Sequence, residues 1–247
     1  MKSLNLLLKI DSISISKKLG NSLSSIILVR HGKSLWNIEN RFTGWTDIPL
    51  SHEGVQEAEL AAKKVLNKNL NITKAYSSIF SRAYDTGEII LKNSNNSHIE
   101  LVKDWRLNER HYGKLQGLNK SQTSDKYGED QVFKWRRSFS VKPPILGKIE
   151  YNNQLNNPLF SEIPKEKIPD GESLEDTANR VEMFCKDILY KDLEINNNIL
   201  IAAHGNSLRA LIKIIENKSE KETEKLEIQT GKPIFYSYNQ KTFKIVN

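Results

Sequence analysis

One stretch decides how the chain folds: Ser25-Ile26-Ile27-Leu28-Val29-Arg30-His31-Gly32-Lys33-Ser34. Its first five residues are nearly all apolar and include β-branched side chains, a pattern typical of a strand buried on both faces of a parallel sheet. In open α/β sheets, ligand sites lie just beyond the carboxyl ends of such strands, so we expect Arg30, His31 and Gly32, which follow this strand, to lie at a ligand site. We expect Gly32 to turn the backbone sharply and to leave His31 facing a crevice.

A second histidine has the same setting near the other end of the chain. Residues 199–203 (Ile-Leu-Ile-Ala-Ala) form another apolar run, and His204-Gly205-Asn206 follow directly. Two strands therefore deliver two histidines to one edge of the predicted sheet.

The rest of the chain alternates between predicted strands and helices. Further strands are expected at 74–77, 99–102 and 234–238, the last in the chain, and helices over 51–66, 78–90, 121–138, 173–188 and 208–215. Residues 104–120 are expected to be a loop, and 152–169 an excursion without periodicity. This alternation predicts an α/β fold, a three-layer α/β/α sandwich with a mostly parallel central sheet. We expect one catalytic domain at 25–247, preceded by a disordered extension at 1–24.

Composition narrows the class of partner. The net charge of +7 over 247 residues is compatible with nucleic acid, an anionic membrane or small phosphorylated substrates. Many cations lie in the blocks expected at the crevice, and the sequence contains no nucleic-acid-binding motif. No run approaches the ~20 apolar residues that a membrane span needs, and the single cysteine excludes a disulfide framework. We therefore expect a cytoplasmic protein with a small phosphorylated substrate, and with no metal, nucleic-acid or membrane partner.

Several further blocks surround the two histidines in the sequence. They are Asn37, Arg41–Trp45, Leu107–Gly113, Leu115–Lys120, Trp135–Arg137 and Ala203–Arg209. Together with Arg30-His31-Gly32 they resemble the cofactor-dependent phosphoglycerate mutases of the histidine phosphatase superfamily, over about residues 25–240. The tripeptide alone would be a weak signal, but long ordered blocks in one chain are specific.

The resemblance implies a reaction and its catalytic residues. It implies that 3-phosphoglycerate and 2-phosphoglycerate are interconverted through a phosphohistidine at His31, primed by 2,3-bisphosphoglycerate and without a metal. Glu109 is expected to shuttle the proton, and His204, if protonated, to stabilise charge on the transferring phosphoryl group. Arg30 and Arg82 are expected to lower the pKa of the nucleophile and to bind the phosphoryl oxygens.

A larger set of residues is expected to bind the substrate. Besides Arg30, His31, Arg82 and Glu109 it comprises Gly32, Lys33, Ser34, Asn37, Thr43, Gly44, Arg110, His111, Tyr112, Lys120, Arg136, Arg137, Gly205 and Asn206. Arginine pairs offer bidentate geometry to a carboxylate or phosphate. Arg209 is interpreted instead as a structural ion-pair partner. Relatives in the family suggest a homodimer or homotetramer.

Two departures from the family pattern leave alternatives open. Lys33 stands where glutamate is usual, and the chain stops soon after its last expected strand, where relatives carry a mobile tail. From the shorter end we expect a higher ratio of phosphatase to mutase activity. One alternative is a phosphatase of the same superfamily that acts on a phosphorylated metabolite or protein. Another is a basic module that binds polyanions with a degenerate active site.

Overall fold

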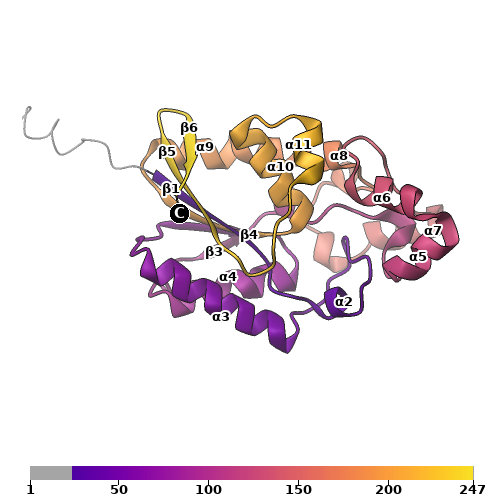
Figure 1. Ribbon diagram of the computed structural model, residues 1–247, viewed down its shortest axis with the longest axis horizontal. Coiled ribbons are helices and arrows are strands. Elements are labelled where there is room, and N and C mark those ends of the chain that lie inside the picture. Colours follow the sequence, from indigo (N-terminus) through magenta and orange to yellow (C-terminus); the bar gives the residue numbers. More distant parts are fainter. Residues whose placement is uncertain (1–23, 247) are drawn as a thin grey trace, which may run out of the picture.

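The computed structural model describes residues 24–246, which form a six-stranded sheet with helices on both faces (Figure 1). The strands are β1 (Ser24–Arg30), β2 (Lys74–Ser77), β3 (Leu101–Lys103), β4 (Asn198–Ala203), β5 (Ile234–Asn239) and β6 (Thr242–Ile245). The α-helices are α2 (Leu35–Ile38), α3 (His52–Asn67), α4 (Ser81–Asn93), α5 (Lys120–Tyr127), α6 (Glu129–Arg137), α7 (Lys148–Leu155), α8 (Leu174–Phe184), α9 (Tyr190–Glu194), α10 (Gly205–Glu216) and α11 (Glu220–Lys225).

The sheet is mostly parallel, with strand order β3-β2-β4-β1-β5-β6. β1 pairs in parallel with β4, whereas β5 and β6 form an antiparallel edge. The register aligns Arg30 with Ala203, so the residues that follow both strands emerge side by side. The backbone N–H of His31 donates to the carbonyl of Ala203 over 3.0 Å. The predicted α/β fold and the expected common edge for the two histidines are thus confirmed.

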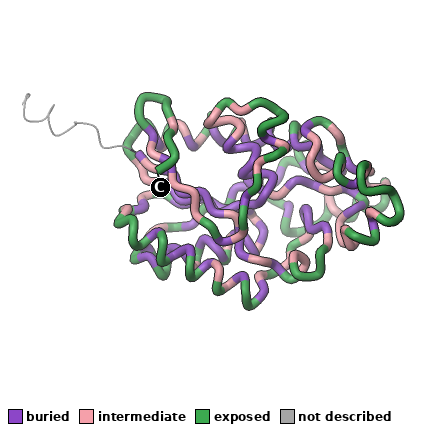
Figure 2. The backbone as a smooth tube through the Cα atoms, in the orientation of Figure 1, coloured by how far each residue is buried: buried purple, intermediate pink, exposed green. Residues whose placement is uncertain are grey.

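Alternation along β1 builds the two faces of the core. Ile26 and Leu28 pack in a cluster with residues of α8 and α10, and Ile27 and Val29 pack in another with residues of α3 and α4. All four strand side chains are fully buried, which explains why the strand reads as one continuous apolar run. Figure 2 shows this buried centre enclosed by exposed loops and outer helix faces.

The structure corrects four expectations about elements. The helix expected over 121–138 is divided into α5 and α6, because Gly128 has φ 86° and ends the first helix. The 152–169 excursion begins within α7, and β6 follows the strand that was expected to be last. Ser24 was assigned to the extension, but it is buried in β1, where its hydroxyl donates to Leu193. The remainder of that extension, 1–23, lies outside the described residues. Among the residues described, no helix is long and apolar enough to cross a membrane.

Candidate active site

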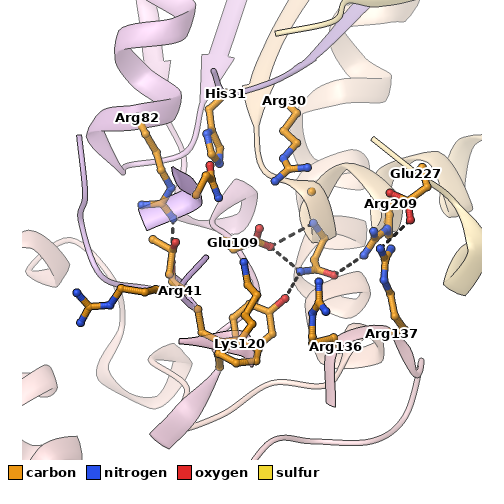
Figure 3. Close-up of a pocket in the computed structure, with 17 residues that line it drawn as sticks. Arg30, His31, Arg41, Arg82, Glu109, Lys120, Arg136, Arg137, Arg209 and Glu227 are labelled. Atoms are coloured by element: carbon orange, nitrogen blue, oxygen red, sulfur yellow. Dashed lines mark hydrogen bonds and ion pairs between the residues drawn. The ribbon is translucent and has the colours of Figure 1, made fainter. Parts of the chain in front are cut away.

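A pocket of about 120 Å³ opens at the carboxyl edge of the sheet, below the roughly 300–1,000 Å³ usual for sites that hold drug-sized ligands. Its lining contains seven cationic side chains and two carboxylates (Figure 3). The lining residues are Arg30, His31, Asn37, Arg41, Phe42, Thr43, Gly44, Arg82, Glu109, Tyr112, Lys120, Arg136, Arg137, Gly205, Asn206, Arg209 and Glu227. A small polyanion is the ligand that such a lining favours.

His31 is held in one tautomer by its own turn. Its Nδ1 lies 2.7 Å from the carbonyl of Gly32, and because a carbonyl can only accept, Nδ1 must donate. Nε2 is therefore left with its lone pair free, as a nucleophile requires. Burial, with help from Arg82 and Arg30, holds the pKa of His31 well below its ordinary value of 6.5.

Gly32 makes this turn possible by close packing. A Cβ atom at this position would lie 2.1 Å from the carbonyl oxygen of Gly54, which is backbone of α3 and cannot move aside cheaply. The backbone N–H of Gly32 donates to the hydroxyl of Thr86 on α4 over 3.1 Å. Both surrounding helices thus set the position of the His31 ring.

His204 lies against His31, with ring centroids 5.0 Å apart and the planes inclined by 63°. It is fully buried, and neither ring nitrogen has a hydrogen-bond partner within the part of the chain that the structure describes. Burial, followed by the charges of Arg82 and His31, holds its pKa well below 6.5. This favours a neutral imidazole rather than a protonated one, and a neutral ring can still donate one N–H to an oxygen.

Two arginines flank the imidazole pair. Arg82 is 1% exposed and donates from Nη1 to Thr46 and from Nη2 to Gly44, both over 2.9 Å, which orients its guanidinium toward the pocket. Burial lowers the pKa of Arg82 to about 10, so it stays charged at neutral pH. Arg30 donates from Nη1 to Ile228 over 2.8 Å, while its buried Nε has no partner among residues 24–246. Both place N–H donors near the ring of His31 (Figure 3).

Glu109 stands in the middle of the pocket, with Arg30, His31 and Arg82 on one side and Lys120 and Arg136 on the other (Figure 3). Its Oε1 accepts three bonds, from the backbone N–H of Arg110 over 2.8 Å and from the backbone and side-chain nitrogens of Asn206 over 3.2 and 3.0 Å. With Oε1 engaged in this way, Oε2 is the oxygen left to exchange a proton.

The far end of the pocket is lined by cations from helices. Arg137 pairs with the exposed carboxylate of Glu227 over 2.7 Å, and Arg209 donates to Oδ1 of Asn206 over 3.0 Å. Burial lowers the pKa of Arg209 to about 10 and also lowers that of Lys120. Desolvated cations of this kind gain most from an anionic ligand.

The pocket lining leaves out five of the expected substrate-binding residues. Gly32 packs against Gly54 as described, and Ser34 caps α2 by accepting the N–H of Asn37. Lys33 has a 40% exposed side chain that pairs with Glu53 on α3, and its contact with substrate stays a prediction.

The other two residues lie behind the lining. Arg110 is fully buried and donates from Nη2 to the carbonyls of Trp135 and Arg136, both over 2.7 Å. His111 is also buried, and its Nε2 bonds to Gln154 over 2.7 Å. Their first role is to hold neighbouring segments in place, and direct substrate contact for these two stays a prediction. His204 is likewise absent from the lining, and its fully buried ring lies against that of His31.

Four lining residues were missed. Three of them, Arg41, Phe42 and Arg209, lie inside the sequence blocks quoted above. Their position in those blocks could have identified them as site residues. Arg209, interpreted as an ion-pair partner, instead reaches the pocket and bonds to Asn206. The sequence around Glu227 does not mark it as a site residue, because only the packing of its segment brings it close to Arg137.

Comparisons with known proteins agree with this geometry. The sequence profile of the histidine phosphatase superfamily (branch 1) matches residues 26–151 and 148–247. A 2,3-bisphosphoglycerate-dependent phosphoglycerate mutase of Lactiplantibacillus plantarum is 44% identical over 89% of this chain and 95% of its own length. The chain belongs to the phosphoglycerate mutase family of the histidine phosphatase superfamily. The mutase of Borreliella burgdorferi is 46% identical over 87% of both chains.

Solved structures of histidine phosphatases share the fold. Phosphoglycerate mutase from Bacillus anthracis superposes with a TM-score of 0.66 at 21% identity, covering 91% of this chain and 92% of that one. A mycobacterial glucosyl-3-phosphoglycerate phosphatase superposes with a TM-score of 0.69 at 20% identity, covering 90% and 97%. At this level of identity the likeness concerns the architecture of the sheet and its helices.

Proposed function

We propose that this phosphoglycerate mutase family member interconverts 3-phosphoglycerate and 2-phosphoglycerate through a phosphohistidine at His31, primed by 2,3-bisphosphoglycerate. The observation that carries the proposal is the neutral His31 ring, with Nε2 free, among seven cationic side chains and beside the Glu109 carboxylate. The names of the relatives support the same reading.

Charge balance supports the identity of the primer. Two phosphate groups and one carboxylate carry a total charge of about −4 to −5 at neutral pH. The seven cations of the pocket exceed its carboxylates by five, or by six when Glu109 carries the proton that it transfers, which is a similar charge of opposite sign. Complementary charge of this size favours a bisphosphorylated acid over a neutral sugar or a monoanion.

The chemistry follows from the positions of the side chains. Nε2 of His31 attacks the phosphorus of the primer, and the bond from that phosphorus to the glycerate oxygen breaks. N–H donors of Arg30, Arg82 and His204 stabilise the three equatorial oxygens, and Glu109 gives its proton to the departing oxygen. In the second half of the cycle the free 2-hydroxyl of bound 3-phosphoglycerate gives its proton to Glu109 and attacks the phosphorus on His31, whose bond to Nε2 breaks, so that 2,3-bisphosphoglycerate forms. Transfer of the 3-phosphoryl group of this molecule to His31, with the Glu109 proton returning to the departing oxygen, then leaves 2-phosphoglycerate. The glycerate carboxylate and the second phosphate are held by the helix cations Lys120, Arg136 and Arg137 and by Tyr112. The rest of the binding site consists of Asn37, Thr43, Gly44, Gly205 and Asn206.

The decisive experiment is labelling with radioactive 2,3-bisphosphoglycerate followed by mapping of the labelled residue. We expect a label on His31, its loss in His31→Gln, and its retention in the matched surface variant His52→Gln. Isomerisation should depend on the primer. A label at another residue would contradict the proposal, and release of phosphate from several esters without isomerisation would favour the alternative phosphatase.

We further propose that the reaction needs no metal and that the protein is a cytoplasmic homodimer or homotetramer. Seven cations around His31 oppose the entry of a divalent cation, so EDTA should leave the rate unchanged. The oligomeric state rests on the family and is measured by light scattering.

A further inference from the structure

A buried ion pair lies behind the pocket, at residues that no sequence block singled out. Glu172 and Arg180 are 5% and 6% exposed, and neither lines the pocket. Nε of Arg180 donates to Oε1 of Glu172 over 2.7 Å, and Nη2 donates to Oε2 over 3.0 Å, a bidentate arrangement. Burying two charges is costly unless their remaining hydrogen-bonding groups are also satisfied.

Two further hydrogen bonds of Arg180 go to the loop that carries Glu109. Nη1 donates to the carbonyl of Arg106 over 2.8 Å, and Nη2 also donates to the carbonyl of Glu109 over 3.0 Å. One guanidinium on α8 thus joins two points of this loop to Glu172.

Glu172 holds the loop at a third point. Its Oε2 accepts the backbone N–H of His111 over 2.8 Å, and its own backbone N–H donates to the carbonyl of His111 over 2.9 Å. The segment from residue 106 to residue 111 is therefore attached at 106, 109 and 111.

The Glu109 backbone needs such attachment, because it lies between two short 3-10 turns, outside any strand or α-helix. Its carbonyl accepts a second bond from the indole N–H of Trp45 over 2.6 Å. Its carboxylate is meanwhile oriented by Asn206 on α10. Small errors in the position of a proton carrier reduce a rate steeply, by about 10²-fold per Å.

We propose that the Glu172–Arg180 ion pair is a positioning device that places the Glu109 carboxylate for proton transfer. Neither residue touches the substrate, and both act through the backbone of the 106–111 segment. The inference rests on the proposed role of Glu109 as proton carrier.

The test compares two phosphoryl donors in the full-length protein. When 2,3-bisphosphoglycerate phosphorylates His31, the departing alkoxide needs a proton. When p-nitrophenyl phosphate does so, the departing nitrophenolate is stable without one. We expect Arg180→Lys to slow phosphorylation by the first donor about 10- to 100-fold and by the second less than about threefold. Glu109→Gln should show the same selectivity.

Two further variants separate positioning from folding. Glu172→Gln weakens the ion pair, and Trp45→Phe removes the other donor to the Glu109 carbonyl, so both should show the same selectivity, the second more weakly. The matched control is Lys186→Gln, which breaks the exposed 2.9 Å ion pair with Glu182 just after α8 and should change neither rate.

A double-mutant cycle makes the link to Glu109 direct. In Glu109→Gln/Arg180→Lys, we expect no loss beyond that of Glu109→Gln alone, because the group being positioned is gone. Multiplied losses, or equal losses with both donors, would overturn the inference while leaving the proposed function intact. A Glu109→Gln variant without selectivity would instead refute the proton-carrier role, and the positioning role with it.

Discussion

The rings of His31 and His204 lie 5.0 Å apart, yet their nitrogens have opposite surroundings. His31 donates from Nδ1 to its neighbouring carbonyl, whereas both nitrogens of His204 lack a partner within the described residues. A buried polar group without a partner is costly, so we expect His204 to donate an N–H to a phosphoryl oxygen of the bound substrate. The pair therefore combines one imidazole whose Nδ1 is fixed as a donor with a second imidazole that has no hydrogen-bond partner within the described residues.

The low pKa of His31 determines how the rate of its phosphorylation depends on pH. Because burial and Arg82 keep the ring neutral well below pH 6.5, Nε2 stays available where a free histidine is already protonated. We expect the rate of His31 phosphorylation by p-nitrophenyl phosphate, which needs no acid, to be level from about pH 8 to about pH 6. Rapid-quench labelling measures it. A midpoint near 6.5 would contradict this expectation.

The same depressed pKa values make stability depend on pH. Below pH 6.5 the unfolded chain binds protons at His31 and His204, whereas the folded chain does not. The free energy of unfolding should therefore fall as the pH drops below 6.5, by about 1.4 kcal/mol per pH unit for each of the two residues. Urea titrations at several pH values measure this slope. It should be shallower in His31→Gln/His204→Gln and unchanged in the exposed control His52→Gln; equal slopes would refute the assignment.

Gly32→Ala tests the close packing beneath the nucleophile. The new Cβ would lie 2.1 Å from the carbonyl oxygen of Gly54, so the backbone must shift, at a cost of about 1–3 kcal/mol. We expect a lower melting temperature and slower labelling of His31. In Gly205→Ala, the Cβ meets nothing closer than Arg30 Nε at 3.6 Å, so the melting temperature should stay near that of the parent. Equal melting temperatures for the two variants would argue against the packing role.

Glu227→Gln tests whether a carboxylate competes with the substrate for a cation. Glu227 is 69% exposed and pairs with Arg137 at the far end of the pocket. An exposed pair of this kind contributes about 0.2–1 kcal/mol, so its removal should lower the KM for 3-phosphoglycerate by up to about fivefold. Glu129→Gln removes an exposed carboxylate at the start of α6 and serves as the control. A KM that rises in Glu227→Gln would mean that Glu227 orients Arg137 for binding.

The apolar runs in the sequence predicted the central strands correctly, because the strands that are followed by site residues are buried on both faces. The β1 and β4 segments are continuous apolar runs that end at polar residues, and the parallel register follows from that arrangement. Helices were also predicted over 51–66 and 173–188, and in the structure α3 and α8 begin directly after Ser51 and Ser173, whose side chains accept backbone N–H groups. The break at Gly128 was missed, although a glycine is a common signal for the end of a helix.

The sequence alone was enough to predict a nucleophilic histidine, a second histidine and a cluster of cations at one edge of an α/β sheet. That is because a buried strand, its end and the turn after it are all local features. It could not show that Lys33 turns away to Glu53, that Arg209 reaches the pocket, or that Glu172 and Arg180 hold the loop of Glu109. Each of these contacts joins residues from different helices and loops, so it exists only after the helices have packed on the sheet. The protonation states of the two histidines likewise depend on burial and on neighbouring charges, which the folded chain alone brings together.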